Sequence, residues 1–173
     1  MKTKSKSILS LLCLLALTSF FTGCGEIVIS DPVFTEPVIS ADQVRIRNGL
    51  AYRANQSKPF TGVVVRNHEN GQKALEGEYK DGKWDGKWTS WSTNGQKRAE
   101  GSLRNGEWDG KRTEWYENDQ KKVEGYYKDG LQEGKWTYWH ENGQKMAEGC
   151  WEDGLEDGKW TVWYDNGQKN GEG

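Results

Sequence analysis

The stretch WTYWHENGQKMAEG, Trp136 to Gly149, nearly repeats an earlier one, WTSWSTNGQKRAEG, Trp88 to Gly101. The pattern Asn-x-Gln-Lys recurs every 24 residues, with its asparagine at positions 70, 94, 118, 142 and 166. A Glu-Gly pair follows each copy at a constant distance, from Glu76-Gly77 to Glu172-Gly173. A fixed period of this kind sets the architecture of a chain. The sequence therefore predicts a repeat array over residues 58–173.

Two turn signals divide each repeat into two strands. The first turn carries Asn-Gly or a close variant, and the second carries Asp-Gly or Asn-Gly, as at Asp81-Gly82. These dipeptides favour two-residue type I′ loops, in which both residues need a positive φ; Asp119, which replaces one of the glycines, belongs to a residue type that tolerates this conformation. About ten residues separate successive turns, which is the length of a strand. We therefore predict an all-β fold, an elongated, twisted antiparallel meander of 24-residue β-hairpin repeats.

Counting outward from these turns predicts the strand register. The Asn94-Gly95 loop is predicted to pair Trp88 with Gly101, Ser90 with Ala99 and Trp91 with Arg98, and the Asp81-Gly82 loop Tyr79 with Trp84, Gly77 with Gly86 and Leu75 with Trp88. Side chains alternate between the two faces of a sheet. One face, the aromatic face, then combines large rings with glycines, so that a ring can lie over its neighbour's bare backbone. Its predicted members are Leu75, Gly77, Tyr79, Trp84, Gly86, Trp88, Ala99, Gly101 and Leu103.

The opposite face is predicted to be polar except for one tryptophan per repeat, and it includes Lys87, Thr89, Arg98 and Glu100. We call these tryptophans the tryptophan ladder: Trp91, Trp115, Trp139 and Trp163. Successive members lie two strands apart, or about 9–10 Å. Two interpretations are open. The indoles pack on neighbouring Thr, Lys and Arg stems with some cation–π stabilisation, or the ladder is a platform for a sugar, a peptide or a partner surface.

The amino terminus has a different character from the array. Lys2, Lys4 and Lys6 precede an apolar run, residues 8–21, that is too short for a membrane span and is typical of a cleaved signal peptide. The run ends in FTGC, which resembles the lipobox of bacterial lipoproteins and implies cleavage before Cys24 and lipidation of its thiol. The alternative is an ordinary secretory signal with a chance cysteine. Several acyl chains would hold the protein persistently on a membrane.

These features predict four segments. Residues 1–23 are expected to be the signal peptide with its helix, and residues 24–43 an extended lipidated tether. The apolar residues of that tether alternatively lie along the first strands of the fold. Residues 44–57 are expected to form a small hairpin around Asn48-Gly49, followed by the array at 58–173. The expected location is the bacterial cell envelope, outside the cytoplasm and anchored to a membrane.

Composition argues against several classes of function. Removal of the signal's three lysines leaves 21 basic and 26 acidic residues, a net charge of −5, and the lysines are spread evenly, so no nucleic-acid groove is predicted. Cys150 remains as one thiol, at a position that other repeats fill with Glu78, Ser102 or Tyr126. His68 and His140 share a position with Ser92, Tyr116 and Tyr164. No catalytic residue, metal site or cofactor is predicted, because an active site needs one unique constellation.

The residues from Tyr79 to Gly106, YKDGKWDGKWTSWSTNGQKRAEGSLRNG, resemble the MORN repeat, in its bacterial variant branch with the NGQK turn. The matching positions include Gly82, Gly86, Gly95 and Glu100-Gly101. Two positions depart from the pattern. The second glycine of Gly-x-Gly is Trp88, Arg112, Trp136 or Trp160, and the tyrosine of Tyr-Glu-Gly is Leu75, Ala99, Val123 or Ala147.

The resemblance implies a single-layer sheet and a non-enzymatic recognition or scaffolding role near a membrane. Three classes of function follow as expectations. The first is a membrane-anchored module that binds a protein partner. The second is an antitoxin, the label often given to this branch, which suits only an exported toxin because the signal directs the chain out of the cytosol. The third is binding of envelope carbohydrate through the tryptophan ladder.

Overall fold

A computed structural model describes residues 37–172. The predicted signal peptide, its helix and Cys24 lie outside the described residues. Among residues 37–172 no helix has the length and apolar character that a membrane span requires.

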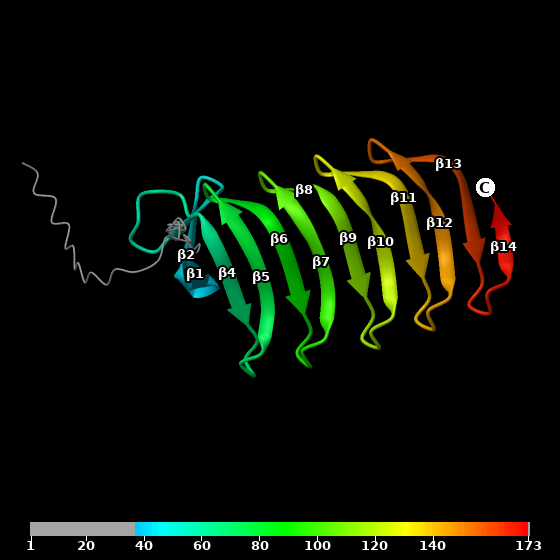
Figure 1. The fold of residues 1–173 in the computed structure, drawn as a ribbon, viewed down its shortest axis with the longest axis horizontal. Helices are drawn as coiled ribbons and strands as arrows, with labels where there is room; N and C mark the ends of the chain where they lie inside the picture. Colours follow the sequence, from blue (N-terminus) through cyan, green and yellow to red (C-terminus); the bar gives the residue numbers. More distant parts are fainter. Residues whose placement is uncertain (1–36, 173) are drawn as a thin grey trace, which may run out of the picture. The chain divides into compact units, whose positions relative to one another are not determined.

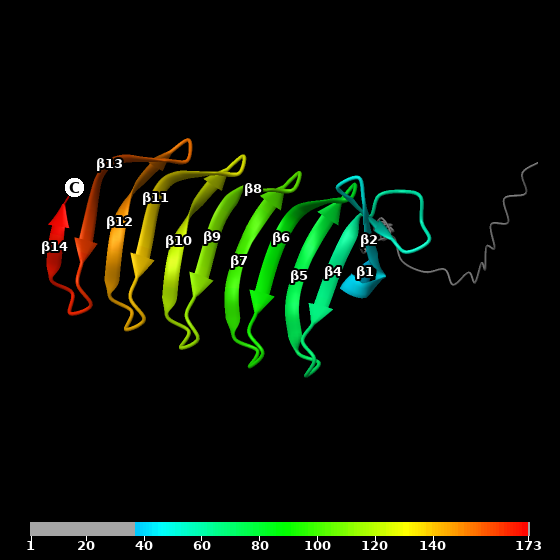
Figure 2. The same cartoon turned by 180° about the vertical axis from the view of Figure 1, so that it is seen from behind.

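The array is a meander in which consecutive strands pair antiparallel, as predicted. Figures 1 and 2 show the strands side by side in one layer, with the Asn-x-Gln turns along one edge and the Asp-Gly turns along the other. The strands of the array are β4 (Gly62–Asn67), β5 (Lys73–Lys80), β6 (Lys83–Trp91), β7 (Lys97–Arg104), β8 (Glu107–Trp108), β9 (Gly110–Trp115), β10 (Lys121–Lys128), β11 (Leu131–Trp139), β12 (Lys145–Glu152), β13 (Leu155–Trp163) and β14 (Lys169–Glu172). Strands β8 and β9 occupy the place that β6, β11 and β13 each fill alone.

Residues before the array close its first edge. Strand β1 (Val38–Ser40) pairs parallel with β4, and a short 3-10 helix, η1 (Ala41–Gln43), leads into β2 (Val44–Arg47) and β3 (Leu50–Arg53). Strands β2 and β3 form a hairpin around Asn48-Gly49. The predicted tether therefore includes a strand, in line with the alternative that its apolar residues join the fold.

A small apolar core lies at this covered edge. Ile39 of β1 packs with Phe60 and Val64, and all three are at most 5% exposed. The Phe60 backbone N–H donates to the Ala51 carbonyl, and the Ala51 N–H donates to the Gly82 carbonyl, both at 2.8 Å. A capped first repeat is what a stacked array needs, because each repeat otherwise buries its surface only against its neighbours.

The two kinds of turn differ, and this corrects the predicted register. Asp81-Gly82 has positive φ at both residues, as a type I′ turn requires. At Asn94-Gly95 only the glycine has positive φ, and the Gly95 N–H donates to the Ser92 carbonyl. This is a three-residue loop, which adds a residue to the following strand. Asp119, at the glycine position of another such turn, does adopt a positive φ of 63°.

The added residue shifts the pairing at the ends of β6 and β7. Trp88 pairs with Gly101 and Ser90 with Ala99, as predicted, but Trp91 pairs with Lys97, so the predicted pair of Trp91 with Arg98 is wrong. Arg98 lines a cavity together with Trp88, Ser90 and Ala99. It therefore lies on the aromatic face and not with the tryptophan ladder.

A larger bulge interrupts the first part of β6. Tyr79 pairs with Trp84 as predicted, but Gly77 pairs with Trp88, and Leu75 pairs with Ser90. The predicted pairs of Gly77 with Gly86 and of Leu75 with Trp88 are wrong, because Asp85, Gly86 and Lys87 lie opposite the single residue Glu78. Gly86 has a φ of 119°, and a Cβ there would overlap the Glu78 side chain, so Gly86 does not face the rings. A shift of the strand pairing by two residues keeps the Trp88 side chain on its predicted face, whereas a shift by one residue would move it to the opposite face.

The bulge bends each such strand, so that its first residues lie over the neighbouring turn. The Gly106 N–H donates to the Trp84 carbonyl at 2.7 Å, and the Gly130 N–H donates to the Trp108 carbonyl at 2.9 Å. Figure 1 shows the starts of β11 and β13 turned across the sheet edge. The bent strand starts therefore cover part of the single layer, and aromatic side chains are buried beneath them.

Rings of the aromatic face contact one another across repeats. Their centroids lie 5.1–6.2 Å apart in the run Trp88, Trp108, Tyr127, Trp136, Tyr138, Trp160 and Trp151. These distances are within the range that favours aromatic pairs. Trp136 is 3% exposed, and its indole lies against the bare backbone of Gly125.

Gly125→Ala tests this contact. The added Cβ would overlap the Trp136 indole, so the free energy of unfolding should fall by about 1–3 kcal/mol, as for other overpacked sites. Urea denaturation measures the change. Gly171→Ala is the control, because its added Cβ meets no atom within 4 Å, and it should shift stability by about 0.5 kcal/mol or less. Equal stability of the two variants would contradict the packing described here.

Candidate binding site

The tryptophan ladder lies on one face of the sheet, at the ends of β6, β9, β11 and β13. Each indole is partly buried. Thr89 precedes Trp91 on the same face and pairs with Glu76 on one side and Glu100 on the other. The same neighbours surround Trp115 and Trp139, because Thr113 and Thr137 also pair with glutamates. The structure thus places all four predicted residues on the polar face.

A lysine from the preceding repeat covers each indole. The distances from the ammonium nitrogen to the ring centroid are 5.2 Å for Lys73 over Trp91, 5.4 Å for Lys97 over Trp115, 5.7 Å for Lys121 over Trp139 and 5.7 Å for Lys145 over Trp163. Cations within about 6 Å of an indole centroid are attracted to the ring. The contacts of the packing interpretation, between each indole and a neighbouring lysine, are therefore present in the structure. Each indole also keeps a solvent-exposed part that a partner can contact.

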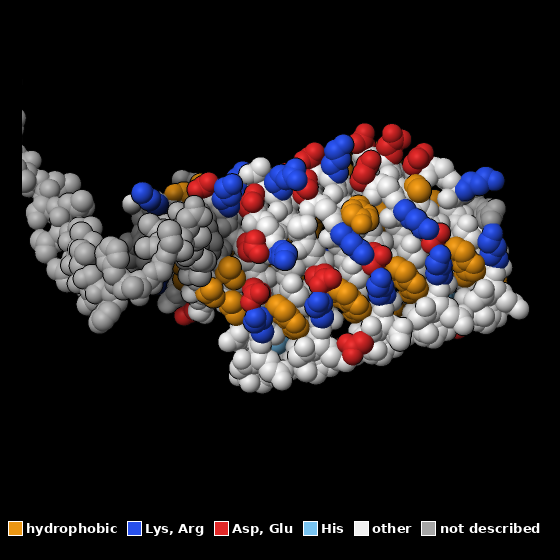
Figure 3. Space-filling view, in the orientation of Figure 1, with side chains coloured by type: hydrophobic (Ala, Val, Ile, Leu, Met, Phe, Trp, Pro, Cys, Tyr) orange, Lys and Arg blue, Asp and Glu red, His pale blue; other side chains and the backbone are white. Residues whose placement is uncertain are grey.

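The same lysines bind a glutamate three residues further along. The ion pairs are Lys73–Glu76 at 2.5 Å, Lys97–Glu100 at 2.7 Å, Lys121–Glu124 at 2.7 Å and Lys145–Glu148 at 2.6 Å. Figure 3 shows this face, with a row of hydrophobic patches that each adjoin a basic and an acidic side chain. We call this the ladder face. It combines aromatic area with both signs of charge at a regular interval.

Two of the glutamates bind a second lysine. Lys111 lies 3.1 Å from Glu124, and Lys135 lies 2.9 Å from Glu148. Hydrogen bonds from Lys135 and Lys145 lower the pKa of Glu148 to about 2. Burial raises the pKa of Glu124, but the hydrogen bonds from Lys121 and Lys111 outweigh it, so that this pKa is also lowered. Both carboxylates are therefore charged at neutral pH.

The histidines support the ladder from the turn before it. His68 Nε2 lies 2.9 Å from the Trp91 carbonyl oxygen, and His140 Nε2 lies 3.0 Å from that of Trp163. The Tyr116 hydroxyl donates to the Trp139 carbonyl at 2.8 Å. One position thus accepts His or Tyr because both reach the same carbonyl. Both histidines have a structural role in the array.

Asparagines of the first turns also bind the next repeat. The side-chain amides of Asn70, Asn118 and Asn142 donate to carbonyls 23 residues further along, at 2.6–2.7 Å. The repeated Asn of the NGQK pattern therefore joins successive turns. Sequence reasoning assigned this Asn to the turn alone, and only its exact 24-residue spacing hinted at a bond between repeats.

Cys150 is exposed and has a free thiol. Within residues 37–172 no group of three or more His, Cys, Asp or Glu side chains is arranged to hold a metal ion.

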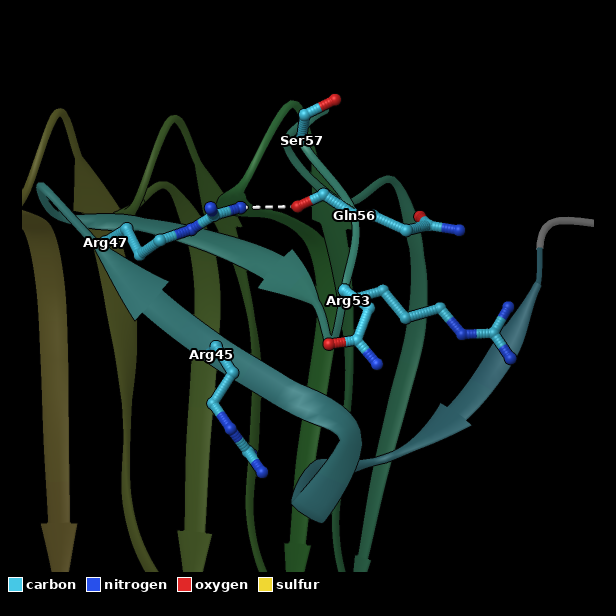
Figure 4. A pocket seen from close by; sticks show the side chains of 6 residues that line it. Arg45, Arg47, Arg53, Gln56 and Ser57 are labelled. Carbon is cyan, nitrogen blue, oxygen red and sulfur yellow. Dashed lines mark hydrogen bonds between the residues drawn. The ribbon is translucent and has the colours of Figure 1, made fainter.

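A cavity beside the first hairpin is rich in arginine but does not concentrate its charge. Arg45, Arg47 and Arg53 line a volume of about 420 Å³. Figure 4 shows Arg45 and Arg53 pointing in different directions, while Arg47 donates to the Gln56 carbonyl. Arg47 also stacks on Tyr52 at 3.8 Å. These guanidinium groups do not meet around one position.

Comparison with known families identifies the repeat. The family described as MORN repeat variant matches five segments, at residues 60–81, 84–105, 108–129, 132–153 and 156–173. The chain belongs to the MORN repeat variant family. These segments coincide with the meander of β4 to β14 and its 24-residue period. The MORN family is a non-catalytic repeat module, commonly one that binds proteins or membranes.

Other comparisons add little. No curated protein matches the MORN chain. Among solved structures, it is similar to one described as "Crystal structure of GtfA/B complex bound to UDP and GlcNAc", with 10% sequence identity and a TM-score of 0.25. The alignment covers 84% of this chain and 28% of that one. A TM-score this low carries no argument about fold or function.

Glu148→Gln tests the double ion pair of the ladder face. The pKa of Glu148 is about 2 in the folded chain, against 4.5 for an unperturbed glutamate, so its stabilisation is present above pH 4.5 and is lost as the pH falls toward 2. At pH 7 the variant should lose about 1–2 kcal/mol, less than the pKa shift alone converts to, because solvent reaches the pair. Urea denaturation at several pH values measures the difference between variant and parent.

The matched control is Glu76→Gln. Glu76 has one lysine partner and is 41% exposed, against 22% for Glu148, so the control should cost less. A loss for Glu148→Gln that is as large at pH 2 as at pH 7 would contradict the assigned charge interaction.

Proposed function

We propose that this MORN repeat protein is a non-catalytic, membrane-anchored lipoprotein of the bacterial cell envelope, and that its array binds a protein partner through the ladder face. The observation that carries the proposal is the regular group of Thr, Trp, Lys and Glu on that face. Tryptophan is enriched at the energetic centres of protein interfaces. Lysine and glutamate around each indole supply a polar rim.

The size of the ladder face suits a protein partner. Four indoles spaced two strands apart span about 30 Å, which is comparable with the width of an interface that buries about 800 Å² per partner. A sugar would need the bare face of an indole, and one side of each indole here has a lysine ammonium within 5.7 Å. This favours a protein surface over carbohydrate as the ligand.

The absence of catalysis is part of the proposal and rests on the repetition. The lysine and glutamate of the ladder face recur in all five repeats and the tryptophan in four of them, whereas an active site assembles one unique set of groups. The antitoxin alternative is a special case of protein binding, in which the partner is an exported toxin. This alternative predicts that the protein captured by the ladder face is an exported toxin.

Cys24→Ser tests the anchor. Because FTGC resembles a lipobox, the parent chain should incorporate a palmitate analogue and partition into the detergent phase, and Cys24→Ser should do neither. Cys13→Ser is the control, since Cys13 lies in the predicted signal and should leave labelling unchanged. Recovery of the unmodified parent chain wholly in the aqueous phase would refute the lipid anchor.

Trp139→Ala and Trp136→Ala separate binding from folding. Trp139 lies on the ladder face, so its removal should weaken partner binding by about 1–3 kcal/mol, the range for an aromatic interface residue. The cost in stability should be about 1 kcal/mol or less, the worth of an exposed cation–π contact. Trp136 is buried, so its removal should cost about 3–5 kcal/mol of stability.

The measurement pairs thermal melting with chemical cross-linking of the membrane-anchored full chain, followed by quantification of the captured proteins. The expected result is that Trp139→Ala loses one partner and melts only slightly earlier than the parent chain, well above Trp136→Ala. If Trp139→Ala melts as early as Trp136→Ala, the ladder is structural. If it retains both stability and every partner, binding resides elsewhere.

A further inference from the structure

A hollow lined by residues of the aromatic face and by Trp115 of the ladder breaks the repetition of the array. Two adjoining cavities of about 350 and 340 Å³ share Arg98, Trp115 and Lys122 as lining residues. The first also reaches Arg66, Ser90 and Arg112. We call their union the basic hollow. It lies over β4 to β10, where its lining side chains come from successive strands.

The hollow exists because several repeated positions change together at this place. The position of Ser90 is Glu114 in the next repeat and Tyr138 or Val162 in the two after it. Tyr138 fills the space between Trp136 and Trp160, with centroids 6.2 and 6.1 Å away. Ser90 is too small to do so. Likewise, Arg112 stands where the first repeat has Val64 and the three others have Trp88, Trp136 and Trp160. Space and positive charge therefore appear at the same point.

The position of Arg98 changes in the same way. It is Arg98 and Lys122 at the hollow, but Met146 and Asn170 further along the array. Two cations thus face the hollow, and the same position carries no charge once the aromatic packing resumes. This is the unique constellation that the rest of the array lacks.

Most of the cations in the basic hollow lack an acidic partner. Among the described residues, the side chains of Arg66 and Arg98 have no hydrogen bond or ion pair, and the Lys122 ammonium has only the Tyr116 ring, 5.8 Å away. Arg112 binds Glu114 at 2.5 Å and stacks on Trp108 at 4.4 Å, yet its buried Nε has no acceptor. An anion held among these groups would satisfy donors that the protein itself leaves open.

The charge balance indicates the valence of that anion. The basic hollow is lined by four basic side chains and by two acidic ones, Glu114 and Glu117, with His68 at its rim. Its net charge is therefore +2 with histidine neutral, in a chain whose net charge is −2. A phosphate monoester carries about −1.5 to −2 charges at neutral pH, and the planar fork of arginine matches its oxygens.

We propose that the basic hollow binds a phosphate monoester group, with the attached organic part lying against Trp88 and the aromatic walls. The group comes from a soluble organic phosphate or from a lipid headgroup, and both present the same dianion. The site adjoins the ladder at Trp115, which lines both cavities, but its four basic side chains are not the lysines of the Lys–Trp contacts.

Isothermal titration of the full-length chain tests the proposal with two probes. Glycerol 3-phosphate represents the soluble source, and dihexanoyl phosphatidic acid, kept below its micelle concentration, carries the same headgroup on a lipid. Saturable binding of either probe is expected. Equal affinities would show that the headgroup suffices, and tighter binding of the lipid would assign the membrane as the source. Binding of neither probe overturns the proposal.

Variants taken from the array itself locate the site. Arg98→Met and Lys122→Met introduce the residue found at Met146, and each should weaken binding about tenfold, the equivalent of one charge-assisted hydrogen bond. Ser90→Tyr introduces the residue found at Tyr138 and should block binding by filling the hollow while every cation remains. Thermal melting confirms that the variants fold.

The matched control is Lys145→Met. Lys145 lies on the ladder face, bound to Glu148 and placed over Trp163, and none of these residues lines the hollow, so removal of its charge should leave binding unchanged. A loss of affinity in Lys145→Met equal to that in Arg98→Met would show a general electrostatic effect and overturn the proposal. Unchanged binding in Ser90→Tyr would show that the hollow is not the site.

Discussion

The contact between an indole and the bare backbone of the next strand is the constraint on which this sheet depends. A single layer has no second sheet to cover its apolar side, so rings must be buried by the layer itself. Gly125 and Gly149 let the indoles of Trp136 and Trp160 approach the backbone, where a Cβ would overlap them. The two-residue bulge at Gly86 and its equivalents then bends the strand over these rings. Loss of these glycines, or of the bulge, would expose the aromatic side chains to water.

Bonds between repeats follow from the same geometry. Because each repeat presents the same groups at the same height, a donor in one repeat meets an acceptor 22 or 23 residues away in a neighbouring repeat. The turn glycines, the asparagines of NGQK and the histidines all use this relation. The Lys–Trp contacts of the ladder face also join neighbouring repeats, over 18 residues. Stability is therefore a sum of nearly identical steps between neighbours.

The fold was predictable from the sequence because the turn signals and the period are local and repeated. The face of Trp88 and that of the ladder were also correct, since an inserted pair of residues preserves the alternation. The strand pairing near Gly77 and the face occupied by Arg98 were predicted wrongly, because both depend on bulges that the turn dipeptides do not encode. The parallel pairing of β1 with β4 was not predicted, because no turn joins the two strands; the sequence offered only the alternative that apolar residues of the tether lie along the first strands. The basic hollow was not predicted because it arises where several repeated positions change together, and sequence reasoning took variation at one repeated position as evidence against a special role.

The direction of the hydrogen bonds has a mechanical consequence. Bonds between strands run perpendicular to the strands, and therefore along the line on which the repeats succeed one another. A force that separates the two ends of the array loads these bonds in series, and it detaches strands one at a time at low force. A force along the strands loads all the bonds of a pair at once and meets far greater resistance. An array of this kind tethered at one end and pulled at the other would extend in steps of one repeat, each reversible when the load is released.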